Sequence, residues 1–369
     1  MRITEKISHA AERKAFETIL DNLIQKGQTQ DAGQIANDLV NMVQKLHSDV
    51  WSEKSFQTLH MLANEPDGKW AHYVQRLIRD NDPYILKTFL TNAVYEGGIR
   101  GYHVAQETAA KYDINVPWLI LMDPTSACNM HCTGCWAAEY GHKQSLTFEE
   151  MDKTLTEAKA LGTHACLFTG GEPFADIEKL QLMLDEIPTT HRVFINTTLP
   201  VSQDQTEDDI LAFAERNKHK ITCINVSRHM QHYVVESNDS LLTRLPVPFR
   251  INCVLYKDYP KENLIPFIER FHKIPGASIQ FRFDYTATTP ENLYEPDKIL
   301  HDLKEVAEYT GLDGCRMRCG FHFDYKGMEL TYHKTLPYST IVETDPKDGV
   351  TYDILYDILI KQNGDIHSD

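Results

Sequence analysis

Residues 118–135, WLILMDPTSACNMHCTGC, contain an apolar run followed by three cysteines. The cysteines Cys128, Cys132 and Cys135 have the spacing C-x3-C-x2-C. A structural zinc site uses four ligands, usually as two pairs. No second pair stands near this one, and His131 would serve only with strain. Three thiolates instead suit a [4Fe–4S] cluster that leaves one iron without a protein ligand.

Short apolar runs alternate with amphipathic helical segments from Trp118 to Gly311. The expected strands are 118–122, 164–169, 192–198, 222–227, 249–256 and 278–284. The expected helices are 147–162, 175–187, 206–220, 240–245, 262–274 and 296–311. This alternation indicates βαβ units around a parallel sheet, and six units predict an α/β fold with a partial (β/α)6 barrel. The active site then lies at the carboxyl ends of the strands, where the cysteines stand.

Three regions are expected along the chain: an N-terminal helical region over 1–112, the barrel over 113–311, and a small, mostly β C-terminal extension over 312–369 at the barrel mouth. Apolar residues recur at helical spacing before the barrel. Gly27 is expected to end the first helix, Pro83 to break a later one, and Gly97-Gly98 to stop it. The tetrapeptide QNGD, 362–365, is typical of a hairpin turn.

Composition excludes several classes of protein. The chain has 369 residues with 37 Lys and Arg against 53 Asp and Glu, a formal net charge of −16, which disfavours binding to bulk nucleic acid. Eight cysteines are too few for a disulfide scaffold. The N-terminus does not read as a signal peptide, and no apolar stretch is long enough to span a membrane. A cytoplasmic location is expected.

A second motif, FTGGEP at 168–173, ends the second expected strand. Together with the cysteines it resembles the radical S-adenosylmethionine (SAM) superfamily over 118–311. The resemblance implies that the three cysteines hold a [4Fe–4S] cluster and that SAM chelates the fourth iron. The reduced cluster would cleave SAM to a 5′-deoxyadenosyl radical that abstracts hydrogen from a substrate, with a reductant such as flavodoxin or ferredoxin. Reaction subclass and catalytic side chains stay open.

The resemblance also implies residues that bind SAM. Gly170, Gly171, Glu172 and Pro173 would hold its amino group, since glycines allow close backbone approach and an acid suits an ammonium. Family members usually have an aromatic residue before the third cysteine. That position is Gly134 here, and Trp136 is expected near the adenine instead. The remaining expected contacts, at strand ends, are Asn196, Thr197 and Ser227.

Other polar residues and cysteines admit two interpretations. The Asn252 side chain either faces the barrel interior or hydrogen-bonds to backbone groups. Arg282 either lines the substrate pocket beside Tyr285 or forms a structural ion pair. Many family members carry a C-terminal SPASM-type extension with auxiliary clusters. Cys315 and Cys319 do not complete such a set, so a degenerate or absent extension of this type, without an auxiliary cluster, is expected.

Two functions from different classes are compatible with the sequence. The first is a radical SAM enzyme acting on a small molecule or lipid precursor, with a peptide as the other possibility. The second is a non-enzymatic module, an iron–sulfur electron carrier or a zinc site. An electron carrier needs no SAM site, so the Gly-Gly-Glu-Pro motif favours the enzyme.

Overall fold

The computed structural model describes most of the chain. It covers residues 3–46, 53–65, 68–128, 130, 132, 135, 141, 143–186, 192–230, 238–256, 259–283, 288–289, 292–293, 296–313, 320–333, 340–344, 351–355, 357–360 and 366–367. The chain separates into two compact units, Met1–Val104 and Ala105–Asp369. The expected region boundaries stay predictions, and each unit is considered by itself.

The first unit is helical, as predicted. Its elements are α1 (Ile3–Gly27), α2 (Ala32–Leu46), α3 (Glu53–Ala63), α4 (Lys69–Asp80), α5 (Pro83–Phe89) and the π-helix η1 (Leu90–Gly101), which runs on into α6 (Tyr102–Tyr112). Gly27 ends α1, and Pro83 begins a new helix. The Asp82 side chain caps that helix by accepting the N–H groups of Tyr84 and Ile85 at 2.9 and 3.1 Å.

The expected stop at Gly97-Gly98 is wrong. Both glycines lie inside η1, whose wider turn continues the helical path to Gly101. The preceding residue, Glu96, is fully buried and is held by α1: Arg13 Nη1 lies 2.7 Å and His9 Nε2 3.0 Å from its carboxylate. These contacts between distant parts of the chain outweigh the low helix propensity of two glycines, which is a local and weak preference.

We expect Glu96→Ala to lower the free energy of unfolding by about 2–3 kcal/mol, because it leaves Arg13 and His9 without their buried acceptor. Glu17→Ala is the matched control. Glu17 contacts the same arginine at 3.0 Å but is partly exposed, so its loss costs about 0.5 kcal/mol or less. Urea denaturation followed by circular dichroism measures both. Equal effects of the two substitutions would contradict the structural role of Glu96.

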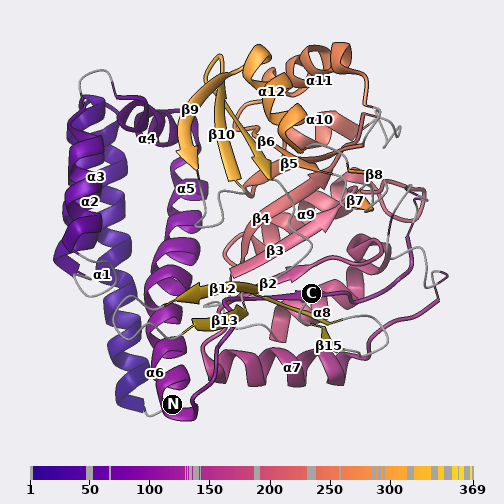
Figure 1. The fold of residues 1–369 in the computed structure, drawn as a ribbon. Coiled ribbons are helices and arrows are strands. Elements are labelled where there is room, and N and C mark those ends of the chain that lie inside the picture. Colours follow the sequence, from indigo (N-terminus) through magenta and orange to yellow (C-terminus); the bar gives the residue numbers. More distant parts are fainter. Residues whose placement is uncertain are drawn as a thin grey trace. The chain divides into compact units, whose positions relative to one another are not determined.

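The second unit is built on a single large sheet. Its first six strands are β1 (Leu119–Met122), β2 (Ala165–Phe168), β3 (Arg192–Thr197), β4 (Ile221–Ser227), β5 (Phe249–Leu255) and β6 (Ile279–Phe283). They are parallel and adjacent in chain order, as the sequence predicts (Figure 1). All six expected strands form, and the α/β fold class with a radical-SAM-type partial barrel is confirmed.

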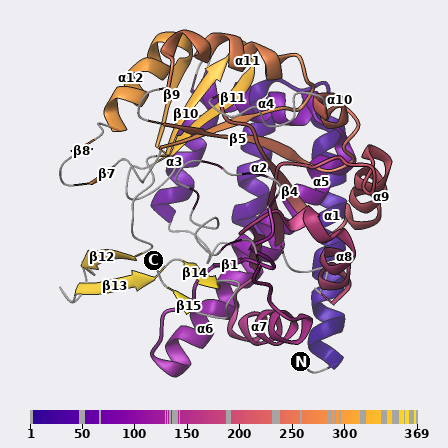
Figure 2. The same cartoon turned by 90° about the vertical axis from the view of Figure 1, so that its right-hand side faces the viewer.

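Helices cover the outer face of these strands. They are α7 (Phe148–Leu161), α8 (Ile177–Glu186) after the short η3 (Pro173–Asp176), α9 (Glu207–Asn217), α10 (Asp239–Leu242), α11 (Leu264–His272) after η5 (Lys261–Asn263), and α12 (Pro296–Val306). Figure 2 shows them in an arc around the strands. Capping boxes at Thr147 and Thr206 begin α7 and α9. Apolar side chains between helices and sheet form the main core.

The C-terminal region extends the sheet at both ends. The expected helix 296–311 ends early, at Val306, and Glu308–Asp313 forms β9 instead. With β10 (Gly320–Tyr325) and β11 (Met328–His333) it continues the sheet, β11 pairing parallel with β6. At the other end β14 (Asp357–Ile360) pairs with β1, and β15 (Ile366–His367) pairs antiparallel with β14.

Four short strands stand apart from this sheet, as two antiparallel pairs: β12 (Thr340–Thr344) with β13 (Thr351–Leu355), and β7 (Thr288–Thr289) with β8 (Asn292–Leu293). The QNGD turn, Tyr285 and the cysteines Cys315 and Cys319 lie outside the described residues. The prediction that no auxiliary cluster forms therefore stays a prediction.

Candidate functional site

The cysteine loop leaves β1 at its carboxyl end and is closed at its base by backbone pairing. Thr125 and Ser145 form an isolated antiparallel bridge. Next to it, Ser126 N donates to Gln144 O at 2.8 Å, and Gln144 N donates to Ser126 Oγ at 2.9 Å. Because both ends of the loop are tied together, the cysteines between them are confined to the edge of the sheet where β1 ends.

A lysine from α8 strengthens this closure. Lys179 Nζ lies 3.1 Å from Ser145 Oγ and 3.4 Å from Pro124 O, and it also donates to Leu146 O. Burial lowers the pKa of Lys179. One ammonium with three donors therefore joins the two strands at the base of the loop. Nothing in the sequence distinguishes this lysine from a surface residue of an amphipathic helix.

The three cysteines form a group of free, half-buried thiols. Burial, with the nearby charges of Cys135 and Cys128, raises the pKa of Cys132 to about 11. Cys135 N donates to Cys132 O at 3.2 Å. A group of three soft sulfur donors fits a [4Fe–4S] cluster. His131, Gly134 and Trp136 lie outside the described residues.

The Gly-Gly-Glu-Pro segment pairs with the stretch that leads into the cysteines. Thr169 N donates to Met122 O at 2.9 Å, Gly171 N to Thr125 O at 2.8 Å, and Glu172 N to Ala127 O at 2.7 Å. These bonds prolong the β1–β2 pairing beyond the ends of both strands. The two motifs that the sequence singled out separately are thus one paired structure, which ends at Cys128.

The glycines are required by this pairing. A Cβ on Gly171 would lie 2.2 Å from Ala127 O and 2.6 Å from Ser126 C, far inside contact distance. Gly170 has φ +95°, and a Cβ there would meet the Asp123 side chain at 2.7 Å. The sequence-based interpretation gave these glycines close approach to a ligand. The close approach that the structure contains is between the two loops themselves.

Glu172 has its carboxylate directed into the protein. It is 1% exposed, and its oxygens accept hydrogen bonds from Phe174 N (3.0 Å), Thr197 Oγ1 (2.5 Å), Thr198 N (2.7 Å) and Thr198 Oγ1 (2.8 Å). Burial raises the pKa of Glu172, and these hydrogen bonds oppose the rise. The carboxylate ties the motif to the end of β3. Its expected contact with the SAM amino group stays a prediction.

Pro173 begins η3 and is buried. Its ring fits the first position of a helix, where no backbone donor is needed. The N–H groups of Gly171 and Glu172 and the Glu172 carbonyl are bonded within the protein, and the expected contacts of Gly170, Gly171 and Pro173 with SAM stay predictions.

The expected strand-end residues divide between two faces of the sheet. Asn196 lies on the inner face, where its Nδ2 donates to Thr169 Oγ1 at 3.2 Å and its Oδ1 accepts from Asn225 Nδ2 at 2.8 Å. Ser227 is half-buried at the end of β4. Thr197 is 2% exposed and its hydroxyl is used by Glu172 and by Leu199 N. Asn196 and Thr197 are both hydrogen-bonded within the protein, and the expected contacts of Asn196, Thr197 and Ser227 with SAM stay predictions.

A buried arginine that follows β4 supports the same strand ends. Arg228 is 1% exposed; its Nη1 donates to Thr198 O at 2.9 Å, its Nη2 to Asn238 Oδ1 at 2.6 Å, and Asp239 Oδ1 lies 3.4 Å from its Nε. Burial lowers the pKa of Arg228. Sequence reasoning did not assign it this role, because an arginine after a strand usually belongs to a surface loop.

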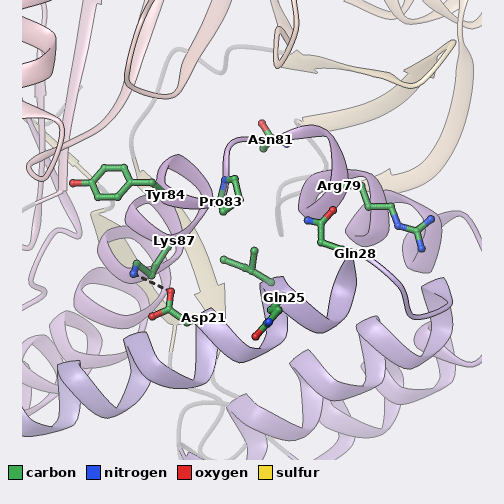
Figure 3. Close-up of a pocket in the computed structure, with 9 residues that line it drawn as sticks. Asp21, Gln25, Gln28, Arg79, Asn81, Pro83, Tyr84 and Lys87 are labelled. Atoms are coloured by element: carbon green, nitrogen blue, oxygen red, sulfur yellow. Dashed lines mark ion pairs between the residues drawn. The ribbon is translucent and has the colours of Figure 1, made fainter.

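A separate, open pocket of about 520 Å³ lies in the helical unit, lined by residues of α1, α4 and α5 (Figure 3). Its charged groups are used within the chain. Lys87 Nζ lies 2.9 Å from Asp21 Oδ1, Arg79 Nη2 donates to Gln30 O at 2.8 Å, and Gln28 Nε2 donates to Ile78 O at 3.0 Å. These contacts join helices, so the pocket is not assigned a ligand.

The fold and the thiol group place three sulfur donors at the carboxyl end of β1 in an α/β fold with a parallel sheet. Residues 122–227 match the model of the Radical SAM superfamily. This part of the chain is therefore similar to that superfamily, whose cofactors are a [4Fe–4S] cluster and SAM. Cys128, Cys132 and Cys135 would hold the first.

Relatives of known name agree with this assignment. GTP 3′,8-cyclases of Clostridium botulinum strains Hall and Langeland are 25% identical over 170 residues, which is 42% of this chain and 53% of each relative. The chain thus spans about half the length of the curated relatives it matches.

Two solved structures share the fold. Streptococcus suis SuiB bound to the precursor peptide SuiA has a TM-score of 0.53 at 15% identity, covering 78% of this chain and 65% of that one. SuiB bound to SAM has a TM-score of 0.51 at 15% identity, covering 81% and 75%. At this identity the likeness concerns the fold. Among the described residues, no helix is long and apolar enough to cross a membrane.

We expect Gly171→Ala to reduce the iron content of the reconstituted protein strongly, because its Cβ would force 171 away from Ala127 and open the paired loops. Gly141→Ala is the control on the other side of the cysteines. Gly141 has φ +68° but open space around its Cβ position, so that variant loses about 1 kcal/mol of stability and keeps its iron. Iron and sulfide analysis decides. Full iron in Gly171→Ala would contradict the steric argument.

Glu172→Ala should lower the free energy of unfolding by about 3 kcal/mol, since the substitution leaves buried donors of Thr197, Thr198 and Phe174 unsatisfied. The affinity for SAM should also fall, because the loss of these hydrogen bonds loosens the segment that is expected to bind SAM. Chemical denaturation and equilibrium dialysis with labelled SAM measure the two effects. A variant with normal stability and weakened SAM binding would show instead that Glu172 acts only as a ligand contact.

Proposed function

We propose that this protein uses its cluster and SAM to generate a 5′-deoxyadenosyl radical that abstracts a hydrogen atom from a small-molecule substrate held on the inner face of the sheet. The observation that carries the proposal is the backbone pairing of the cysteine loop with the Gly-Gly-Glu-Pro segment, because it brings the start of the three-thiol loop against the segment expected to bind SAM. The bound cofactors supply reductive cleavage of the sulfonium bond.

The chain's own residues would position the cofactors and exclude water. We propose that Cys128, Cys132 and Cys135 hold the cluster, that the backbone of 170–173 contacts the SAM amino group, and that Asn196 and Ser227 contact the rest of SAM. Trp136 remains proposed near the adenine. A reductant such as flavodoxin or ferredoxin would deliver the electron. A cytoplasmic location is part of the same proposal.

Two observations bear on the class of substrate: the names of the relatives and the polar side chains of the sheet. SuiB is named with a precursor peptide and the cyclases with GTP, so the relatives include both peptide and small-molecule chemistry. The small molecule is preferred here because the inner face of the described sheet carries polar side chains, among them Asn196, Asn225 and Arg250, on neighbouring strands. The zinc or electron-transfer module is the alternative, and the experiment below separates it.

Anaerobically reconstituted protein, given dithionite and SAM, should release 5′-deoxyadenosine and methionine slowly even without substrate. Each single variant Cys128→Ala, Cys132→Ala and Cys135→Ala should lose the cluster and this product, because a three-ligand site has no spare thiolate. Cys166→Ala is the control, since that thiol is buried in β2. Liquid chromatography and iron analysis provide the measurements.

Two results would contradict the proposal. A fully clustered, reducible wild-type protein that forms no 5′-deoxyadenosine, even with cell extract as a source of substrate, would favour electron transfer. A colourless protein that binds one zinc per chain would favour the zinc module.

A further inference from the structure

The inner face of the sheet carries a group of basic side chains away from the cysteine loop. Arg250 on β5 is paired in register with Asn225 on β4, and Arg282 on β6 is paired with His333 on β11. Because paired residues of neighbouring parallel strands point to the same face, these side chains share the face that carries Asn196 and Ser227. His322 on β10 is paired with Thr331 and belongs to the same face.

In the described part of the chain, the two arginines contact amides and no acidic side chain. Arg250 Nη2 donates to Asn225 Oδ1 at 3.1 Å, and Arg282 Nη2 lies 3.3 Å from Gln280 Oε1. Both acceptors are neutral amides. Among the residues that the structure describes, neither guanidinium forms an ion pair, and Arg250 Nε is buried without a hydrogen-bond partner. An unsatisfied donor of this kind costs free energy unless a ligand completes it.

The other semi-buried arginines of this unit are arranged differently. Arg228 and Arg270 both contact Asp239, at 3.4 and 2.6 Å. The acid on the inner face nearest in register, Glu329, pairs with His322 at 3.1 Å. Within the described part of this unit, Arg250 and Arg282 differ from those arginines in having amide acceptors in place of a carboxylate.

The charges of these groups act on one another. Burial, followed by the charge of Arg250, lowers the pKa of Arg282 to about 10. Burial and the charges of Arg282 and Arg250 lower the pKa of His333 to about 3. His333 is therefore neutral at physiological pH. The local positive charge therefore comes from the two arginines.

Arg282 keeps an exposed surface although the surrounding protein atoms lower its pKa, so a ligand can contact it. Asn252 on β5 is in register with Ser227 on β4 and with Gln280 on β6. Its Oδ1 is buried and has no hydrogen-bond partner among the described residues. This oxygen is a hydrogen-bond acceptor on the same face as the two arginines.

We propose that Arg250 and Arg282 bind an oxyanion of the substrate, a phosphate or a carboxylate group, on the inner face between β5 and β6. Guanidinium groups match the geometry of both anions with paired hydrogen bonds. The chain has a net charge of −16, so two arginines without carboxylate partners among the described residues form a local positive site that attracts anions. The proposal rests on the proposed function, since it assigns the substrate of that same site.

The test uses the full chain with its reconstituted cluster and two probes, inorganic pyrophosphate and citrate, measured by isothermal titration calorimetry at low salt. The wild type should bind at least one probe at millimolar concentration or below. The variant Arg250→Gln with Arg282→Gln should weaken that binding roughly tenfold to a hundredfold, as expected for lost charge-assisted hydrogen bonds. Arg282→Lys, which keeps the charge but not the fork, should be intermediate.

Arg244→Gln is the matched control. Arg244 is an exposed arginine paired with Glu207 and Asp208, so its loss should leave probe binding unchanged. Iron content and circular dichroism establish that each variant is folded. Tighter binding of pyrophosphate than of citrate would indicate a substrate that carries a phosphate group. Tighter binding of citrate would indicate a substrate that carries a carboxylate.

Three results would overturn the proposal: no binding of either probe, equal binding by wild type and the double variant, or an equal loss of SAM affinity in that variant. The last would mean that the arginines bind the carboxylate of the cofactor. Because calorimetry needs no turnover, these results are distinct from a failure to form 5′-deoxyadenosine, which concerns the proposed function alone.

Discussion

The backbone pairing between Thr125–Ala127 and Gly171–Glu172 is the constraint on which the site depends. It extends the β1–β2 pairing past the ends of the strands and brings the start of the cysteine loop against the Gly-Gly-Glu-Pro segment. Without it, the thiol group and the segment expected to bind SAM would be two independent loops. Loops at strand ends are normally the mobile part of an α/β protein, and here a ladder of hydrogen bonds fixes them.

The sequence predicted the fold around this site well where the pattern is local. Alternation of apolar runs and helices predicts all six parallel strands, and the spacing of Cys128, Cys132 and Cys135 predicts metal ligands at the end of the first strand. The sequence did not predict the contacts between residues that are distant in the chain. Lys179 on α8 holds the base of the cysteine loop, and Glu172 accepts hydrogen bonds from the end of β3. The residues next to Lys179 and Glu172 in the sequence do not indicate these partners.

The errors have the same physical origin. Gly97-Gly98 favours a helix end locally, yet Arg13 and His9 hold Glu96 and the helical path continues through η1. The segment 308–311 continues a helical pattern but joins β10 as part of β9. In both cases tertiary contacts outweigh a preference worth about 1 kcal/mol per residue. The arginines of the inner face follow the same rule, since only strand register reveals that Arg250 and Arg282 share a surface.

The central claim is that the paired loops place SAM on the cluster held by the three cysteines. Electron paramagnetic resonance of the reduced protein, with and without SAM labelled with ¹⁵N at its amino group, tests this most directly. The account predicts that SAM changes the spectrum and that pulsed double-resonance measurement detects ¹⁵N coupled to the cluster. An unchanged spectrum with no coupling, in protein shown to bind SAM, would contradict it.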